Sequence, residues 1–238
     1  MSFVAGSGPV IPTFQQSSCI KNNRVFCWDY FSSHWDSVFK PALLQHIGMT
    51  VVAVVIGFVI AFTLAVLAHF ANFLVAPVTF FGSLLYTIPS LAAFEVLVPI
   101  TGINYVTVEI ALVAYTLLIL FTNTLAGLSG ISPEVLDAAR GSGLTRSQIL
   151  MRVELPLALP TIVAGLRVAT VTVISLATIA AFSLIPKGLG QPIYDGSQRN
   201  INTEFIAAAV MCIALALIAD ALLAGGQRLL TPWTRRRR

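Results

Sequence analysis

Few residues of this sequence combine the types and spacing that a chemical reaction requires. The three histidines, His34, His46 and His69, are scattered and form no catalytic set, and the spacing of Cys and His predicts no metal site. The sequence has no glycine-rich loop ending in Lys-Ser or Lys-Thr, the usual means of holding nucleotide phosphates. We therefore predict a chain that is not an enzyme, binds no cofactor and takes its energy from elsewhere.

The composition of the chain indicates that its main elements are membrane spans. Hydrophobic residues make up 57% of the chain, charged residues only 10%, and the mean hydropathy is +0.87. No ionised side chain occurs over residues 41–94, and a helix of that length would be about twice as long as a bilayer crossing. Two spans must share this segment, with the turn at residues 69–72 and Pro77 following it. The isoelectric point near 9.2 reflects orientation in the membrane, and we expect no nucleic-acid partner.

Continuing in this way, the sequence predicts an all-α integral membrane protein with five transmembrane helices. The expected spans are about 47–68, 73–98, 104–124, 157–182 and 205–225. We divide the chain into an extracellular N-terminal tail (1–42), a transmembrane domain (43–228) with a polar loop at 130–156, and a basic cytoplasmic tail (229–238).

The positions of the cations predict that the N-terminus is outside the cell and the C-terminus in the cytoplasm. An odd number of spans puts the termini on opposite sides, and cations are enriched on the cytoplasmic side. In this orientation the cytoplasmic side holds eight cations: Arg140, Arg146, Arg152, Arg228 and the four arginines 235–238. The outer side holds five: Lys21, Arg24, Lys40, Lys187 and Arg199.

The external tail contains two cysteines, Cys19 and Cys27. In an oxidising compartment they could close a small disulfide loop, and the alternative is two free thiols.

The polar loop between the third and fourth spans has the local signals of two short helices. A first helix is expected over 133–140, and Gly143 permits the sharp turn that follows it. Thr145 and Gln148 form a capping box that begins a second helix, which we expect Pro156 to end. The loop is therefore predicted to be a helical hairpin outside the membrane.

The spacing within this loop resembles the cytoplasmic coupling loop of permease subunits in binding-protein-dependent ABC importers. The pattern is acid-Ala-Ala, three residues, Gly, nine residues, aliphatic, one residue, Leu-Pro, with Asp replacing the usual Glu and Val the usual Ile. By this resemblance the contacts with an ATPase are Asp137, Ala138, Ala139, Gly143, Val153, Leu155 and Pro156. The alternative is an ordinary amphipathic loop between spans.

The resemblance implies the type I ABC importer permease fold in a bacterial cell membrane. The implied partners are ABC ATPase subunits that bind the ATP, a second permease subunit, identical or homologous, and an external or periplasmic solute-binding protein. The lipid membrane surrounds the assembly.

A narrower resemblance is to permeases for quaternary-amine osmoprotectants such as glycine betaine, choline and carnitine. It rests on residues 87–92, 143–171 and 187–190, while Thr122 stands where this group has Arg. An importer of amino acids or another small solute is an alternative. A third is an ion-driven carrier or channel, which would require Glu95, Glu109 or Asp220 to be essential.

The second span contains the first candidates for the translocation path. Pro89 interrupts this span, and Thr87 and Ser90 are expected to satisfy the freed carbonyl groups. Tyr86 offers an aromatic face to a cation. The alternatives are a proline kink without function and an interfacial anchoring role for the tyrosine.

Three charged residues complete the candidate path. Glu95 and Glu109 flank the outer turn between the second and third spans and could attract a cationic solute, or lie in the wet interface without a role. Arg167 is expected about 16 Å along the fourth span from Pro156, paired with an acid or with backbone carbonyls at a gate or interface. The alternative is an arginine that snorkels to the surface.

Overall fold

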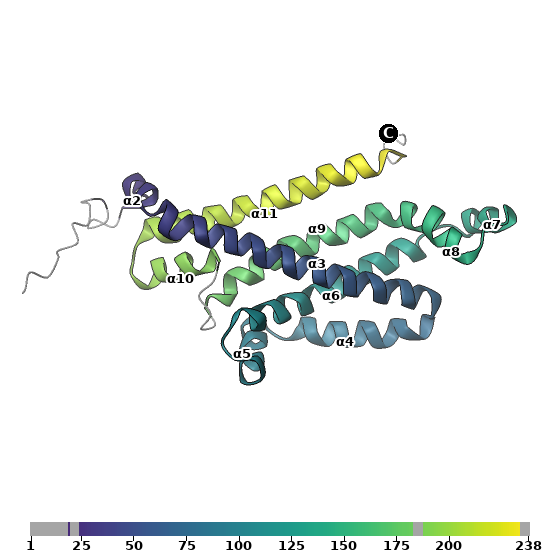
Figure 1. The fold of residues 1–238 in the computed structure, drawn as a ribbon, viewed down its shortest axis with the longest axis horizontal. Helices are drawn as coiled ribbons and strands as arrows, with labels where there is room; N and C mark the ends of the chain where they lie inside the picture. Colours follow the sequence, from purple (N-terminus) through teal and green to yellow (C-terminus); the bar gives the residue numbers. More distant parts are fainter. Residues whose placement is uncertain (1–18, 20–23, 183–187, 234–238) are drawn as a thin grey trace, which may run out of the picture.

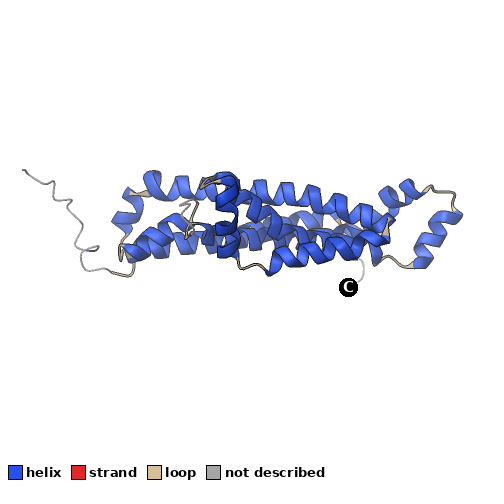
Figure 2. Ribbon diagram, turned by 90° about the horizontal axis from the view of Figure 1, so that it is seen from below, coloured by secondary structure: helices blue, strands red, loops and turns tan. Residues whose placement is uncertain are grey.

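The computed structural model describes residue 19 and residues 24–182 and 188–233, and all regular elements in these ranges are helices (Figures 1 and 2). In order they are α2 (Trp28–Ser33), the π-helix η1 (Trp35–Phe39), α3 (Lys40–Phe70), the 3₁₀ helix η2 (Asn72–Leu74), α4 (Val75–Thr87), α5 (Ser90–Thr101), α6 (Tyr105–Ser129), α7 (Pro133–Gly141), α8 (Arg146–Ile149), the π-helix η3 (Leu150–Glu154), α9 (Leu155–Ala180), α10 (Gly190–Gln198) and α11 (Asn202–Leu230). The long helices lie side by side in an elongated bundle (Figure 2).

Among the described residues, four helical stretches are long and apolar enough to cross a membrane. They are Trp35–Phe70, Tyr105–Ser129, Arg146–Ala180 and Asn202–Leu230. A fifth crossing is obtained if the bent pair Asn72–Thr87 and Ser90–Thr101 counts as one span, and these two segments meet at 99°. The predicted number of five spans therefore depends on a broken second span.

The first helix is longer than the span expected at 47–68. Helix η1 continues into α3, so the proposed boundary between residues 42 and 43 falls inside one helical stretch, Trp35–Phe70. Pro41 does not interrupt it, because the π-helix η1 ends just before the proline and widens the turn that faces its ring and its missing N–H. At the C-terminal end, α11 runs to Leu230, past the boundary expected at residue 228. Hydropathy locates only the apolar part of each helix. The helix itself extends further where no residue ends it.

Small residues let the central helix α6 approach α3 and α9, its two largest contact partners. Gly57 of α3 faces Thr116, and Gly165 of α9 faces Asn123. Further along the same helix pair, Gly127 faces Ala158. Close approach of backbones is the usual way for helices to pack within a membrane. The three helices also share a core that includes Met49, Leu112 and Val173, all fully buried.

We predict that Gly165→Ala destabilises the bundle, whereas Gly225→Ala does not. A Cβ atom at residue 165 would lie 2.5 Å from Cβ of Asn123, while at residue 225 it would meet nothing within 4 Å. The first change should cost about 1–3 kcal/mol through overpacking. The second should be neutral or favourable by up to about 1 kcal/mol because alanine is the better helix former. Thermal unfolding in detergent tests this, and equal unfolding temperatures for the two variants would contradict it.

Candidate functional site

The predicted hairpin is present at one end of the bundle and consists of α7 and α8 (Figure 1). Gly143 turns the chain with a φ of +78°. Its N–H donates to the Arg140 carbonyl at 2.9 Å, which closes the end of α7. The capping box then starts α8, with the Gln148 N–H donating to Thr145 Oγ1 and the Gln148 side chain accepting from the Thr145 N–H. Local hydrogen bonds therefore fix the shape of the hairpin.

The first helix of the hairpin presents a polar face outward. Asp137 and Ala138 are exposed, and Asp137 forms an ion pair with Arg140 at 2.8 Å. Ala139 is buried, so only Ala138 of the two alanines is open to a partner surface. At the start of α7, the Glu134 N–H and the Ser132 hydroxyl stabilise the Glu134 carboxylate and hold its pKa below its usual value.

The second half of the hairpin does not end at Pro156, and that prediction was wrong. The chain passes from α8 through the π-helix η3 into α9, which gives one helical stretch, Arg146–Ala180. In a π-helix the backbone bonds from i to i+5, which widens the turn just before a proline that has no N–H and a bulky ring. Val153, Leu155 and Pro156 are half-buried along this stretch. The hairpin is therefore a direct extension of a membrane span.

A second connection joins the hairpin to α3. His69, at the end of α3, donates from Nε2 to Oε2 of Glu154 at 3.1 Å, and both side chains are largely buried. Beside it the Arg146 guanidinium lies 5.4 Å from the centre of the Phe70 ring. A polar pocket of about 350 Å³ opens at this junction. Neither contact was predicted, since the sequence separates the partners widely and gives no local signal for the pairing.

The second span bends between α4 and α5, where Ile88 and Pro89 are extended. The Tyr115 hydroxyl of α6 donates to the Ile88 carbonyl, and Thr87 Oγ1 donates to the Ser83 carbonyl at 2.7 Å. Ser90 was expected to share this task, but the Ile88 carbonyl is bound from α6 instead. Tyr86 is exposed, and its ring packs edge-on against that of Tyr115 with centroids 6.0 Å apart.

The two acids near the outer turn have different surroundings. Glu95 is exposed on α5. Glu109 lies in α6 with only 7% of its surface exposed, and its carboxylate oxygens make no direct hydrogen bond to the described residues. The hydroxyl of Tyr105, one helical turn earlier, is near enough to interact with it. A buried carboxylate without a direct partner is costly and often marks a functional position.

Arg167 has an acidic partner on another helix. Its Nε and Nη2 atoms donate to Oδ1 and Oδ2 of Asp220 on α11, both at 2.8 Å. This planar two-bond geometry is the strong form of an arginine–carboxylate pair. An acid or carbonyl partner is the one predicted for Arg167, but Asp220 lies 53 residues further along the chain, and no local pattern connects the two.

The cysteines of the N-terminal segment form a disulfide. The Cα atoms of Cys19 and Cys27 are 5.9 Å apart. The Cys27 N–H donates to Thr203 Oγ1 at 2.8 Å, and the Tyr30 hydroxyl donates to Glu204 at 2.9 Å. These contacts attach the segment to the start of α11.

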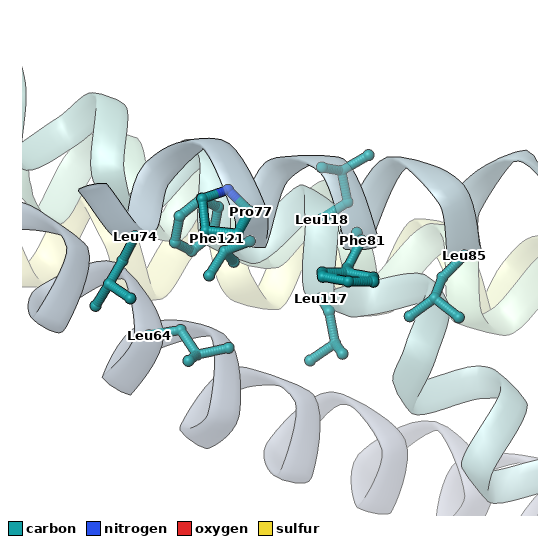
Figure 3. Close-up of a pocket in the computed structure, with 10 residues that line it drawn as sticks. Leu64, Leu74, Pro77, Phe81, Leu85, Leu117, Leu118 and Phe121 are labelled. Carbon is teal, nitrogen blue, oxygen red and sulfur yellow. The ribbon is translucent and has the colours of Figure 1, made fainter. Parts of the chain in front are cut away.

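An apolar pocket of about 260 Å³ lies between α3, α4 and α6, with Leu74 from η2 (Figure 3). The side chains labelled around it are Leu64, Leu74, Pro77, Phe81, Leu85, Leu117, Leu118 and Phe121. It offers no charged or hydrogen-bonding side chain to a polar solute, so it has the chemistry of a lipid-facing hollow.

The sequence profile of the family described as "Binding-protein-dependent transport system inner membrane component" matches residues 53–236. The chain belongs to this family. It is thus a multi-pass inner-membrane permease component of an ABC importer, and the hairpin lies within the matched region.

Curated relatives of the permease are named as permease proteins for choline, carnitine, glycine betaine or osmoprotectant transport. The choline transport system permease protein OpuBB of Bacillus subtilis is 33% identical over 188 residues, covering 79% of this chain and 86% of that protein. The osmoprotectant import permease protein OsmW of Salmonella typhimurium is 36% identical over 193 residues, covering 79% and 89%.

Solved structures agree on the fold. The MetNI methionine ABC transporter in an inward-facing conformation contains a chain that matches with a TM-score of 0.73 at 22% identity, covering 81% of the permease and 95% of that chain. The bacterial alginate ABC transporter matches with a TM-score of 0.70 at 16% identity, covering 90% and 87%. The permease therefore has the type I ABC importer permease fold.

We predict that Gly143→Ala impairs the permease, whereas Gly141→Ala does not. Neither Cβ atom would meet another atom within 4 Å, but only Gly143 has a positive φ. An L-residue at residue 143 should cost about 1–2 kcal/mol and distort the turn of the hairpin. ATP-driven uptake by the assembled transporter should fall for Gly143→Ala alone. Equal uptake by both variants would show that the turn geometry is unimportant.

We also predict that Tyr115→Phe destabilises the bend in the second span. The change removes the donor to the Ile88 carbonyl, and an unsatisfied carbonyl in the membrane should cost about 1–3 kcal/mol. Tyr86→Phe is the matched control, because Tyr86 is exposed and keeps its ring contact after the change. Thermal unfolding in detergent should separate the two variants, and a control as unstable as Tyr115→Phe would contradict the assignment.

Proposed function

We propose that this permease imports quaternary-amine osmoprotectants, the class that includes glycine betaine, choline and carnitine. The names of its relatives support this solute class, because the relatives and this chain cover most of each other's length. The mechanism is supported by the structure of the hairpin, which is a helical extension of a membrane span with an exposed outer face. When a bound partner displaces the hairpin, such an element transmits the displacement to the membrane span.

The subunit that displaces the hairpin is an ABC ATPase, which binds the ATP, since this chain has no phosphate-binding loop of the usual kind. Asp137, Ala138 and Gly143 form the docking surface of the hairpin. The half-buried Val153, Leu155 and Pro156 and the buried Ala139 support it from behind. A second permease subunit completes the pore, and a solute-binding protein delivers the cargo from outside.

In this proposal the hairpin end of the bundle faces the cytoplasm and the N-terminus faces outward. Gln227 donates to the Pro160 carbonyl near the start of α9, so Arg228 lies at the same end as the hairpin arginines. The clustering of arginine at one end agrees with the distribution expected of cytoplasmic segments. The disulfide lies in the N-terminal segment, in agreement with an oxidising outer compartment.

The solute path follows the bend of the second span. Tyr86, Pro89 and Ser90 lie at the break, where extended backbone within the membrane must face protein or water. The buried Glu109 supplies negative charge near the outer end of α6, and the exposed Glu95 lies on the adjoining α5. A quaternary ammonium group would be attracted by these carboxylates and by the face of the tyrosine ring.

Uptake into proteoliposomes tests the proposed function. The permease is reconstituted with its ATPase and solute-binding protein, and uphill accumulation of labelled glycine betaine is measured with and without internal ATP. Accumulation should require ATP and all partners, and unlabelled choline or carnitine should compete. Competition by methionine or histidine alone would instead favour an amino-acid importer. Uphill uptake by the permease without its ATPase would favour an ion-driven carrier and overturn the proposal.

A further inference from the structure

Helix α11 lies along the outside of the bundle (Figure 1). Its buried residues, Thr203, Glu204, Ala207 and Ala208, are all in its first two turns. Near this end Thr178 Oγ1 of α9 also lies 3.1 Å from the Cys212 sulfur. Past Ala208, the residues of α11 are half-buried or exposed, so this part of the helix packs less tightly against the protomer than its first two turns do.

In the described part of the chain, two polar contacts between side chains of α11 and groups of α9 attach this C-terminal half. Arg167 forms the two-bond ion pair with Asp220, and the Gln227 side-chain amide donates to the Pro160 carbonyl at 3.0 Å. The partners are seven residues apart on both helices, which is about 10 Å of helix. The two contacts therefore keep a single antiparallel register and act together against sliding and separation.

The ion pair lies deep within the span. Arg167 is 13 residues, or about 20 Å of helix, beyond Glu154, whose contact with His69 marks the hairpin end. It is seven residues, or about 10 Å, before Ile174, whose carbonyl contacts the buried His46. The Arg167 and Asp220 side chains are 33% and 37% exposed. Hydrocarbon cannot replace a lost partner as water would, so each charge strongly favours keeping the other.

After the turn at Gly143, α8, η3 and α9 form one continuous helical stretch. We propose that Arg167 and Asp220 are positioning residues that make α11 move together with α9. A displacement of the hairpin by the ATPase then shifts both helices as one body. Without the ion pair, α9 would move while the less tightly packed half of α11 followed only in part. The inference concerns the transmission of movement and does not depend on which solute is carried.

The first test measures solute transported per ATP hydrolysed in the reconstituted transporter. We expect Asp220→Asn and Arg167→Gln to lower this ratio on the order of tenfold while ATP hydrolysis continues, because α11 no longer follows the stroke. The charge-reversed double variant Arg167→Asp with Asp220→Arg should recover a substantial part of the ratio. Asp36→Asn is the matched control, since it breaks an exposed ion pair with Lys40 and should change nothing. A normal ratio in both single variants, or a double variant as defective as they are, would overturn the proposal.

The second test measures movement directly and needs no solute. Spin labels are placed at the exposed Leu157 of α9 and Leu229 of α11, in a Cys212→Ser background. In the otherwise unaltered transporter the distance between labels should change by less than about 2 Å on ATP binding, whereas in Asp220→Asn it should change by more. Equal changes in both would overturn the proposal even if uptake fails for another reason. If Asp220→Asn does not assemble, Arg167→Gln is labelled in its place, and a label distance that changes no more than in the unaltered transporter would overturn the inference.

Discussion

The backbone of a membrane span must satisfy its own hydrogen bonds, because hydrocarbon offers none. This constraint explains where the described helices are continuous and where they break. At Ile88 the helical ladder stops, and the Tyr115 hydroxyl takes the place of the missing donor. At Pro156 the ladder does not stop, because the π-helix η3 widens the turn and carries the helix past the proline. Pro89 therefore lies at a bend in the second span, whereas Pro156 lies within one continuous helical stretch.

The continuous helical stretch Arg146–Ala180, here called the rod, can transmit a displacement from the hairpin into the bundle. A hairpin shaped by Gly143 and by a capping box is held by local bonds, and it continues into α9 without a flexible joint. His69 and Glu154 connect the base of the rod to α3, and Gly165 and Gly127 let α6 lie close against α9. A force on the exposed face of α7 would therefore be transmitted along α9 into the bundle. The polar contacts of Arg167 and Gln227 extend that path to α11.

Charged side chains inside the bundle differ in whether they have a partner. Arg167 and Asp220 satisfy each other with ideal geometry, and the His69–Glu154 contact closes the junction at the hairpin. Glu109 belongs to neither contact, since its carboxylate is buried and makes no direct hydrogen bond in the described part of the chain. The Arg167–Asp220 and His69–Glu154 contacts are suited to holding helices together permanently. A carboxylate without such a link is available to a passing cation or a proton, which agrees with the solute class proposed for the path.

The sequence by itself determined the features that depend on neighbouring residues. Composition and the uncharged stretch at 41–94 required membrane helices, and the turn at 69–72 follows from its polar residues. The hairpin followed from Gly143, Thr145 and Gln148, because caps and turns are made within a few residues. The spacing around Asp137 and Pro156 was enough for the family resemblance.

Only the tertiary structure decided which distant groups meet. Arg167 and Asp220 are 53 residues apart, and His69 and Glu154 are 85 apart, so no local pattern could pair them. The donor to the Ile88 carbonyl comes from another helix for the same reason. Pro156 was misjudged because its local preference is to end a helix, whereas the π-turn and the packing of α9 against α6 let the helix continue. Local chemistry specifies helices, caps and turns, but the partners of buried polar groups depend on how the helices pack together.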